Sequence, residues 1–127
     1  MNRTKPVKRE LYYTHDYEWI DFQGSVAYIG VCNFKLSGIK EIQKIEFTGS
    51  IEPVRQGDII ATIQYDDYRI PVHMPTDGKI ISINDMLLTG DKELLLQKPE
   101  TDGWIALIVP GKPLERKGLL QMEKHNY

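Results

Sequence analysis

IQYDDYRI, at residues 63–70, is the stretch that decides the fold, because it reads almost as a mirror image about Asp66-Asp67. A two-residue turn at these aspartates makes a tight β-hairpin, since Asp tolerates the positive φ that such a turn demands. Side chains that face each other across such a hairpin set its register and stabilise it. The predicted pairs are Tyr65 with Tyr68, Gln64 with Arg69, and Ile63 with Ile70.

Short strands are predicted on both sides of this hairpin. Runs rich in β-branched and aromatic residues alternate with turn signals such as Gln23-Gly24-Ser25 and Gln56-Gly57-Asp58. The predicted strands cover residues 17–22, 26–31, 41–47, 59–63, 70–74, 79–83 and 104–109. Pro71 requires an edge strand or an unpaired position because it has no N–H. Gly78 is expected to supply a left-handed residue in the turn before residue 79.

Three short helical segments are expected between or after the strands. Asn33 is a suitable N-cap for a segment beginning at Phe34, because its side chain can accept an orphan backbone N–H. A helical turn is expected near residues 91–95, and Pro113 can start a helix that docks through its leucines. Many short strands with few helical turns predict a mainly β fold, an antiparallel sandwich or flattened barrel with short flanking helices.

Composition excludes several classes of protein. The 127 residues suit one domain, with 41% hydrophobic and 27% charged residues. A net charge of −2 indicates neither nucleic acid nor an anionic membrane as partner. Cys32 is the only cysteine, so no internal disulfide can form and a reducing compartment fits. With no apolar run long enough to span a membrane and no signal-peptide core, we expect a cytoplasmic protein.

The first ten residues carry four basic side chains and are expected to form a flexible tail, residues 1–10, ahead of one folded domain, residues 11–127. The alternative for this tail is a docking arm for an acidic partner. The four bases are Arg3, Lys5, Lys8 and Arg9.

Six motifs, taken in order, resemble the H protein of the glycine cleavage system. The opening YTHDYEWI at residues 13–20 resembles Y-T-x-x-H-E-W-[VI], with Tyr17 in place of the usual His. The others are GSVAYIGV at 24–31, the Gly57-Asp58 turn, PTDGKI at 75–80, Asn84, and GWI at 103–105. The resemblance covers nearly the whole chain and needs no gap between residues 13 and 84.

The resemblance implies a fold of the lipoyl and biotinyl type and a protein that is not an enzyme. Members of this family carry lipoate as an amide on a lysine at the hairpin tip. The lipoyl arm serves a decarboxylase, an aminomethyltransferase and a lipoamide dehydrogenase. The resemblance therefore also implies that the glycine cleavage enzymes are possible partners.

The lysine itself is missing at the position that the resemblance assigns to it. The family's hairpin reads roughly E-S-V-K-A, and the ungapped comparison puts Asp67 at the lysine. Lipoylation needs a primary amine, and the guanidinium of Arg69 is not an acceptor and stays charged. No lysine occurs between Lys44 and Lys79. We therefore expect no lipoate on this hairpin, with a carrier that uses another lysine, Lys79 for example, as the alternative.

The side chains at the tip can be interpreted in two ways. Paired tyrosines across a hairpin usually stabilise it, and aspartates make good turns. Alternatively, the tip is an exposed surface for protein recognition, because Tyr and Arg are favoured at interface hot spots. That surface consists of Tyr65, Asp66, Tyr68 and Arg69, beside the degenerate attachment position Asp67.

Other chemistry finds little support in the sequence. His73 with Asp66 and Asp67 would make a mixed metal site, or the barrel could have been repurposed for a small ligand, but no His or Cys spacing typical of a metal site supports either reading. No catalytic or phosphate-binding motif is present. The leading expectation is a non-enzymatic module without lipoate or metal that binds a protein partner.

Overall fold

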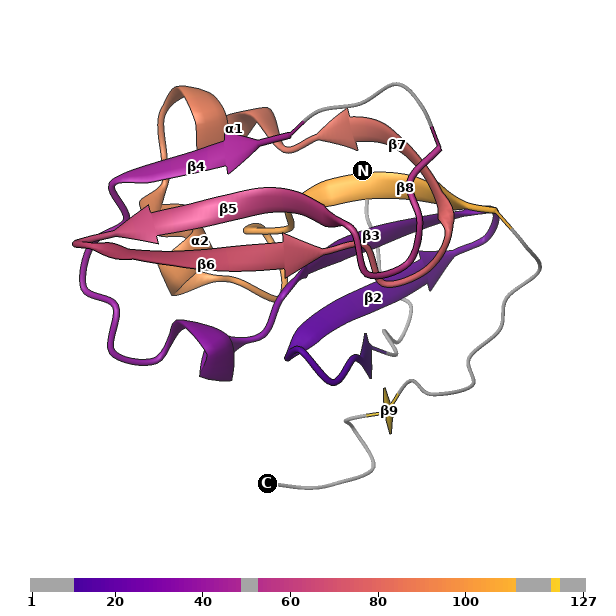
Figure 1. Ribbon diagram of the computed structural model, residues 1–127, viewed down its shortest axis with the longest axis horizontal. Coiled ribbons are helices and arrows are strands. Elements are labelled where there is room, and N and C mark those ends of the chain that lie inside the picture. Colours follow the sequence, from indigo (N-terminus) through magenta and orange to yellow (C-terminus); the bar gives the residue numbers. More distant parts are fainter. Residues whose placement is uncertain (1–10, 49–52, 112–119, 122–127) are drawn as a thin grey trace, which may run out of the picture.

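The computed structural model describes residues 11–48, 53–111 and 120–121, and within these ranges the chain forms two antiparallel sheets and three short helices (Figure 1). The larger sheet has the strand order β7-β8-β3-β2-β1-β9. Its strands are β1 (Tyr12–Tyr13), β2 (Glu18–Gln23), β3 (Val26–Val31), β7 (Gly78–Ile83), β8 (Ala106–Pro110) and β9 (Leu120–Gln121). The smaller sheet has the order β4-β5-β6, with β4 (Lys44–Phe47), β5 (Ile59–Tyr65) and β6 (Tyr68–His73). The helices are η1 (Asn33–Leu36), α1 (Asp85–Thr89) and α2 (Glu93–Gln97).

The two sheets form two layers with a shared apolar core. In Figure 1 the three-stranded sheet lies in front of the larger one, and α1 and α2 lie toward the end at which β5 and β6 meet. One cluster of buried side chains joins both sheets with α1 and α2, and it includes Ile29, Ile63, Leu87, Leu95 and Ile108. This is the mainly β, two-sheet architecture that the sequence predicted.

The β5–β6 hairpin has the predicted register. Tyr65 pairs with Tyr68 and Gln64 with Arg69, and the turn between them consists of Asp66-Asp67. Asp66 has a φ of 49°, the left-handed conformation that a two-residue turn requires. β6 is an edge strand, which explains how Pro71 is accommodated.

The β2–β3 hairpin is fixed by a tryptophan. Trp19 is 1% exposed and pairs with Gly30 across the two strands. Its Nε1 donates to the carbonyl oxygens of Val31 and Pro99, each at 3.0 Å. These bonds tie the hairpin to the loop that follows α2.

Two local predictions were wrong. Asn33 is the first residue of η1 and Cys32 is its N-cap, with no side-chain cap bond. Gly78 does not have a positive φ. It is required because a Cβ there would lie 2.5 Å from the carbonyl oxygen of Val109 in β8. The PTDG turn therefore needs glycine for close strand approach, and Asp77 accepts from the backbone N–H of Gln56 at 2.8 Å.

The segment after β7 contains two helical turns where one was expected. Asn84 is buried, and its side chain caps α1 by accepting from the N–H of Met86 at 3.1 Å. Its Nδ2 donates to the carbonyl oxygens of Asp102 and Trp104 at 3.0 and 2.9 Å. Asn84 thereby holds the start of α1 against the segment that leads into β8.

The ends of the chain differ from expectation where they are described. Residues 120–121 form β9, which pairs with β1, and so the apolar stripe of a C-terminal helix does not include Leu120. The helix start predicted at Pro113 and the basic tail at residues 1–10 both lie outside the described residues. Neither described α-helix has the length or the apolar run needed to cross a bilayer.

Candidate functional site

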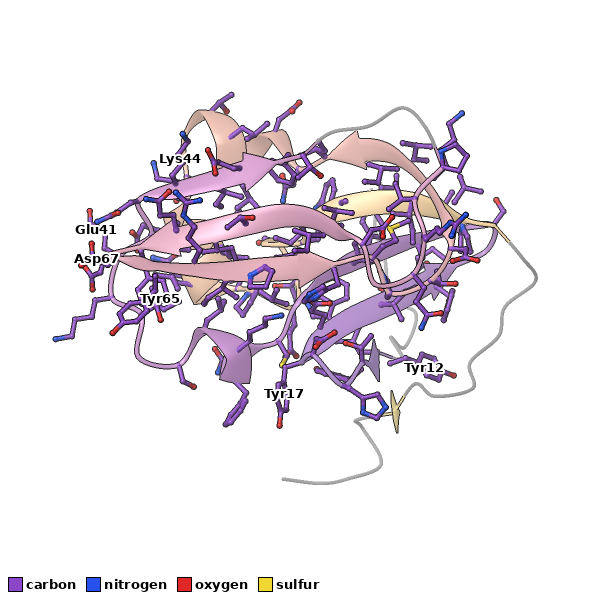
Figure 2. The ribbon with its side chains drawn as sticks, viewed as in Figure 1. Tyr12, Tyr17, Glu41, Lys44, Tyr65 and Asp67 are labelled. Carbon is purple, nitrogen blue, oxygen red and sulfur yellow. The ribbon has the colours of Figure 1, made fainter. Side chains whose placement is uncertain are left out.

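The tip of the β5–β6 hairpin projects the side chains that the sequence singled out. Asp66, Asp67 and Arg69 are exposed, Tyr68 is 63% exposed, and Tyr65 is half-buried. Figure 2 shows Asp67 at the outer end of the hairpin, with Tyr65 just behind it. The two tyrosine rings lie with their centroids 5.4 Å apart and their planes tilted by 30°. The hairpin thus presents an acidic turn supported by a tyrosine pair and followed by Arg69, and we call residues 65–69 the YDDY tip.

The lysines that flank the hairpin in sequence lie elsewhere. Lys44 is on β4, paired with Gln64 of β5, and its Nζ lies 3.0 Å from Oε2 of Glu46. Lys79 is inside β7 of the larger sheet, paired with Val109. Both lysines therefore lie within strands, whereas Asp67 lies at the turn of the hairpin.

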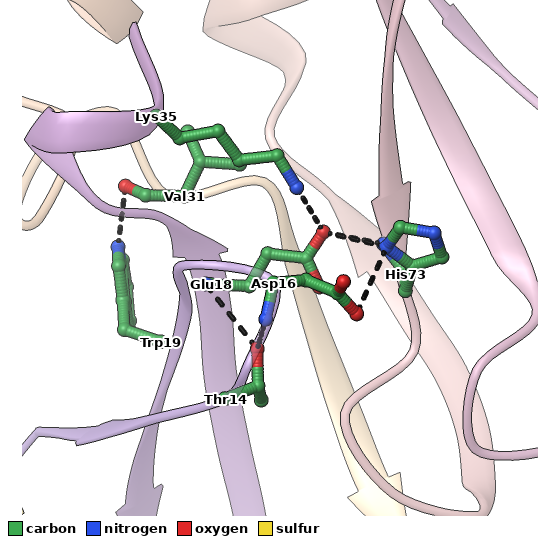
Figure 3. Close-up of polar contacts among 7 residues, drawn as sticks. All are labelled: Thr14, Asp16, Glu18, Trp19, Val31, Lys35 and His73. Carbon is green, nitrogen blue, oxygen red and sulfur yellow. Dashed lines mark hydrogen bonds and ion pairs between the residues drawn. The ribbon is translucent and has the colours of Figure 1, made fainter. Parts of the chain in front are cut away.

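His73 does not lie at the tip, contrary to the metal-site hypothesis that joined it to Asp66 and Asp67. It is the last residue of β6 and pairs with Ile59, so the whole strand separates it from the turn. Its Nδ1 lies 2.9 Å from Oε2 of Glu18 and 3.5 Å from Oδ2 of Asp16 (Figure 3).

A buried carboxylate is the centre of this second group of polar residues. Glu18 is 2% exposed, and its Oε2 accepts from Lys35 Nζ at 2.7 Å and from the backbone N–H of His73 at 2.9 Å. Its Oε1 is buried and has no hydrogen-bond partner among the described residues. Glu18 of β2 and His73 of β6 thus connect the two sheets through hydrogen bonds to one carboxylate oxygen. We call Asp16, Glu18, Lys35 and His73 the inter-sheet cluster.

Two exposed aromatic residues flank the inter-sheet cluster. Tyr17 is 49% exposed and has a φ of 60°, and Phe34 is 66% exposed. Their ring centroids lie 4.8 Å apart. Neither the aromatic pair nor the inter-sheet cluster was predicted. The members of the cluster come from three separate parts of the chain, which are residues 16–18, Lys35 and His73. The alternation of β2 places Glu18 on one face of the strand, but the local pattern does not show its contacts with Lys35 and His73, which are distant in sequence.

Cys32 has no described role in either group. It is buried beside Tyr13 and Trp19, and burial raises the pKa of its thiol above the ordinary value. Such burial is typical of a cysteine that packs as a small apolar side chain.

Two packed antiparallel sheets, short helices and a tight hairpin projecting from one end define a β-domain of the lipoyl type. The family model described as glycine cleavage H-protein matches residues 11–127, and so the chain belongs to the glycine cleavage H-protein family. Proteins of this family are carriers and not enzymes, and they normally carry lipoate.

Individual relatives agree with this assignment. The chain is 29% identical over 119 residues to a probable glycine cleavage system H protein of Aeropyrum pernix, covering 94% of this chain and 82% of the relative. It is 27% identical over 111 residues to the glycine cleavage system H protein of Bartonella quintana, covering 87% of this chain and 90% of the relative. The crystal structure of a glycine cleavage system H protein from Mycobacterium marinum has the same fold, with a TM-score of 0.76 and 18% identity over 93% of this chain and 94% of that one.

Proposed function

We propose that this protein is an H-protein-like module that carries no lipoate and acts by binding a protein through its YDDY tip. The observation behind this proposal is the identity of the tip. The two turn residues are both aspartates, and no lysine occurs from residue 45 to residue 78.

The chemistry of attachment supports this proposal. An amide with lipoate forms on a primary amine, and Asp67 offers a carboxylate on a short side chain. Arg69 is exposed on the same hairpin, but its guanidinium stays charged and does not act as an acceptor. The YDDY tip therefore retains the exposed position of a carrier hairpin without its reactive group.

The tip has the features of a recognition surface. Tyr68 exposes 63% of its surface at the end of a rigid two-strand element, next to two carboxylates and one guanidinium. Tyr and Arg provide much of the binding energy at protein interfaces, and a preformed hairpin loses little conformational entropy on binding.

The partner that fits best is an enzyme of the glycine cleavage system, because the relatives are named as components of that system. This module would then occupy a docking site without transferring a group, as a regulator or an assembly factor. A genuine carrier that uses another lysine is the competing function.

Lipoylation in vitro separates these two functions. The wild-type chain is incubated with lipoate, ATP and a lipoate–protein ligase, and its intact mass is measured beside a lysine-bearing H protein. We expect no increase for wild type and the mass of one lipoyl group for Asp67→Lys. Asp66→Lys, one position away on the same turn, is the matched control and should react less.

A lipoyl group on the wild-type chain would contradict the proposal, and tryptic peptides would show whether Lys44, Lys79 or another lysine carries it. Failure of Asp67→Lys to react, while the lysine-bearing protein does, would contradict the assignment of Asp67 to the attachment position.

Binding through the tip is tested with the purified decarboxylase, aminomethyltransferase and dehydrogenase of the glycine cleavage system immobilised on a biosensor. Tyr68→Ala and Arg69→Ala should each weaken binding to at least one of them by about tenfold or more. Phe34→Ala removes an equally exposed aromatic from η1, away from the hairpin, and should leave binding unchanged. Equal binding by all three variants would refute a role for the tip.

A further inference from the structure

The inter-sheet cluster contains a set of potential metal ligands that the hairpin does not use. Asp16, Glu18 and His73 each offer one ligand atom, and these three atoms lie within 4.8 Å of one another. They come from the turn before β2, from β2 itself and from the end of β6. One imidazole and two carboxylates form a ligand set suited to Zn²⁺ and similar divalent ions.

The backbone holds two of these ligands in place before any ion binds. The hydroxyl oxygen of Thr14 accepts from the N–H of Asp16 at 3.2 Å and from the N–H of Glu18 at 3.3 Å (Figure 3). Between them, Tyr17 adopts a φ of 60°, a conformation that costs free energy in a residue other than glycine. This turn directs both carboxylates toward His73.

One oxygen of the buried Glu18 carboxylate is not used as a hydrogen-bond acceptor by the described residues. Oε1 of Glu18 is buried and unpartnered among the described residues, while Oε2 has contacts with Lys35 and His73. A buried oxygen without a partner is costly in a folded protein. A cation bound by the carboxylate of Glu18 would offset the cost of burying that oxygen.

The same place is open to ions from solvent. The side chain of Asp16 is 55% exposed and that of His73 is 21% exposed, whereas Glu18 lies beneath them at 2%. Ligand atoms around a tetrahedral zinc ion lie about 3.4 Å apart, given bonds of about 2.1 Å. The exposed Asp16 can close the remaining distance by a change of rotamer.

Lys35 is the internal competitor for this site. Its ammonium lies 2.7 Å from Oε2 of Glu18 and is 12% exposed, so it already supplies a positive charge to the buried carboxylate. An ion and this ammonium repel each other, and the lysine therefore lowers the affinity of the site.

From these observations we infer that Asp16, Glu18 and His73 form a divalent-cation site of the zinc class. When the ion is absent, the ammonium of Lys35 pairs with the carboxylate of Glu18. A fourth position is left for water. The site shares no residue with the YDDY tip, so failure of the proposed function at the tip leaves this inference standing.

The test is calorimetric titration of the untagged full-length chain with zinc chloride. We expect one saturable site. Asp16→Asn, at an exposed position, and His73→Gln should each weaken binding by at least about tenfold, and Lys35→Met should strengthen it. His15→Gln is the matched control, because His15 adjoins Asp16 in sequence but is not among the grouped ligands, and it should bind as wild type does.

Circular dichroism establishes that each variant is folded before its affinity is compared. Absence of saturable binding in both wild type and Lys35→Met would overturn the inference, as would equal affinities for wild type, Asp16→Asn and His73→Gln. Unchanged affinity in Lys35→Met alone would overturn the role of the lysine as competitor.

Discussion

The indole of Trp19 fills the space that any side chain at position 30 would need. A Cβ built on Gly30 would lie 2.6 Å from Cζ2 of Trp19, a separation that real Cβ atoms do not adopt. Trp19 cannot move away freely, because its Nε1 is bonded to two carbonyl oxygens. The glycine and the tryptophan therefore form one packing unit across β2 and β3.

Gly30→Ala should destabilise the protein by about 3 kcal/mol, because one methyl group is forced into a filled space between fixed neighbours. Urea unfolding followed by tryptophan fluorescence measures this change. Gly90→Ala is the control, since nothing lies within 4 Å of a Cβ there and its φ is −159°. It should change the free energy of unfolding by less than about 1 kcal/mol. Equal effects of the two substitutions would contradict this packing.

Glu18→Gln should cost about 3 kcal/mol of stability, because it leaves the ammonium of Lys35 half-paired in a buried place. Glu46→Gln removes the same charge from an exposed pair with Lys44, whose side chains are 45% and 61% exposed. That control should cost less than about 1 kcal/mol. The comparison uses chemical unfolding at neutral pH. A loss at Glu18 no larger than at Glu46 would show that the inter-sheet contact adds nothing to stability.

Tyr65 and Tyr68 should be energetically coupled. A double-mutant cycle with Tyr65→Ala and Tyr68→Ala is expected to give a coupling of about 0.5 to 1 kcal/mol, given their ring separation of 5.4 Å. The same cycle between Tyr65 and Tyr28 in the larger sheet should give a coupling near zero. If the tip tyrosines show none, the pair does not stabilise the hairpin. Their presence would then be better explained by binding.

Because of Cys32, the free energy of unfolding should fall as the pH becomes alkaline. Burial raises the pKa of its thiol in the folded state, so the unfolded chain loses this proton first as pH rises. The contribution of the Cys32 thiol to stability is complete below the pKa of the thiol in the unfolded chain, about 8.5. It is lost as the pH rises toward the pKa of the thiol in the folded protein. Wild type should therefore lose more stability than Cys32→Ala between about pH 8 and 10. Parallel pH profiles for the two proteins would contradict a raised pKa at this thiol.

The hairpin could be predicted from sequence because its information is local. Mirror-related side chains about Asp66-Asp67 specify both the turn and the register, and an edge strand was required by Pro71. Close approach at Gly78 could not be predicted, because the neighbour that excludes a side chain is Val109 in a distant strand. The turn composition of that segment therefore predicted the turn correctly, but it predicted a left-handed Gly78 where close strand approach is what requires the glycine.

The inter-sheet cluster was missed for the same physical reason. Glu18 was recognised within a motif, but nothing in the local pattern says that a glutamate at the start of β2 is buried or that His73 lies on it. His73 was offered only as an alternative metal ligand with Asp66 and Asp67, from its proximity to them in sequence. Strand length removes it from the tip, since each β-residue advances the chain by about 3.3 Å.

Pairing of β1 with β9 has a consequence for the order in which the chain folds. Tyr12 lies beside Gln121, so the first and last described strands close the edge of the larger sheet. The β5–β6 hairpin closes over two residues and can form early, whereas this edge waits until the chain has been made as far as residue 121. Until then the edge that β9 covers is open, the kind of edge at which newly made chains associate. A nascent chain of this protein is thus open to association at this edge until residues 120 and 121 have been made.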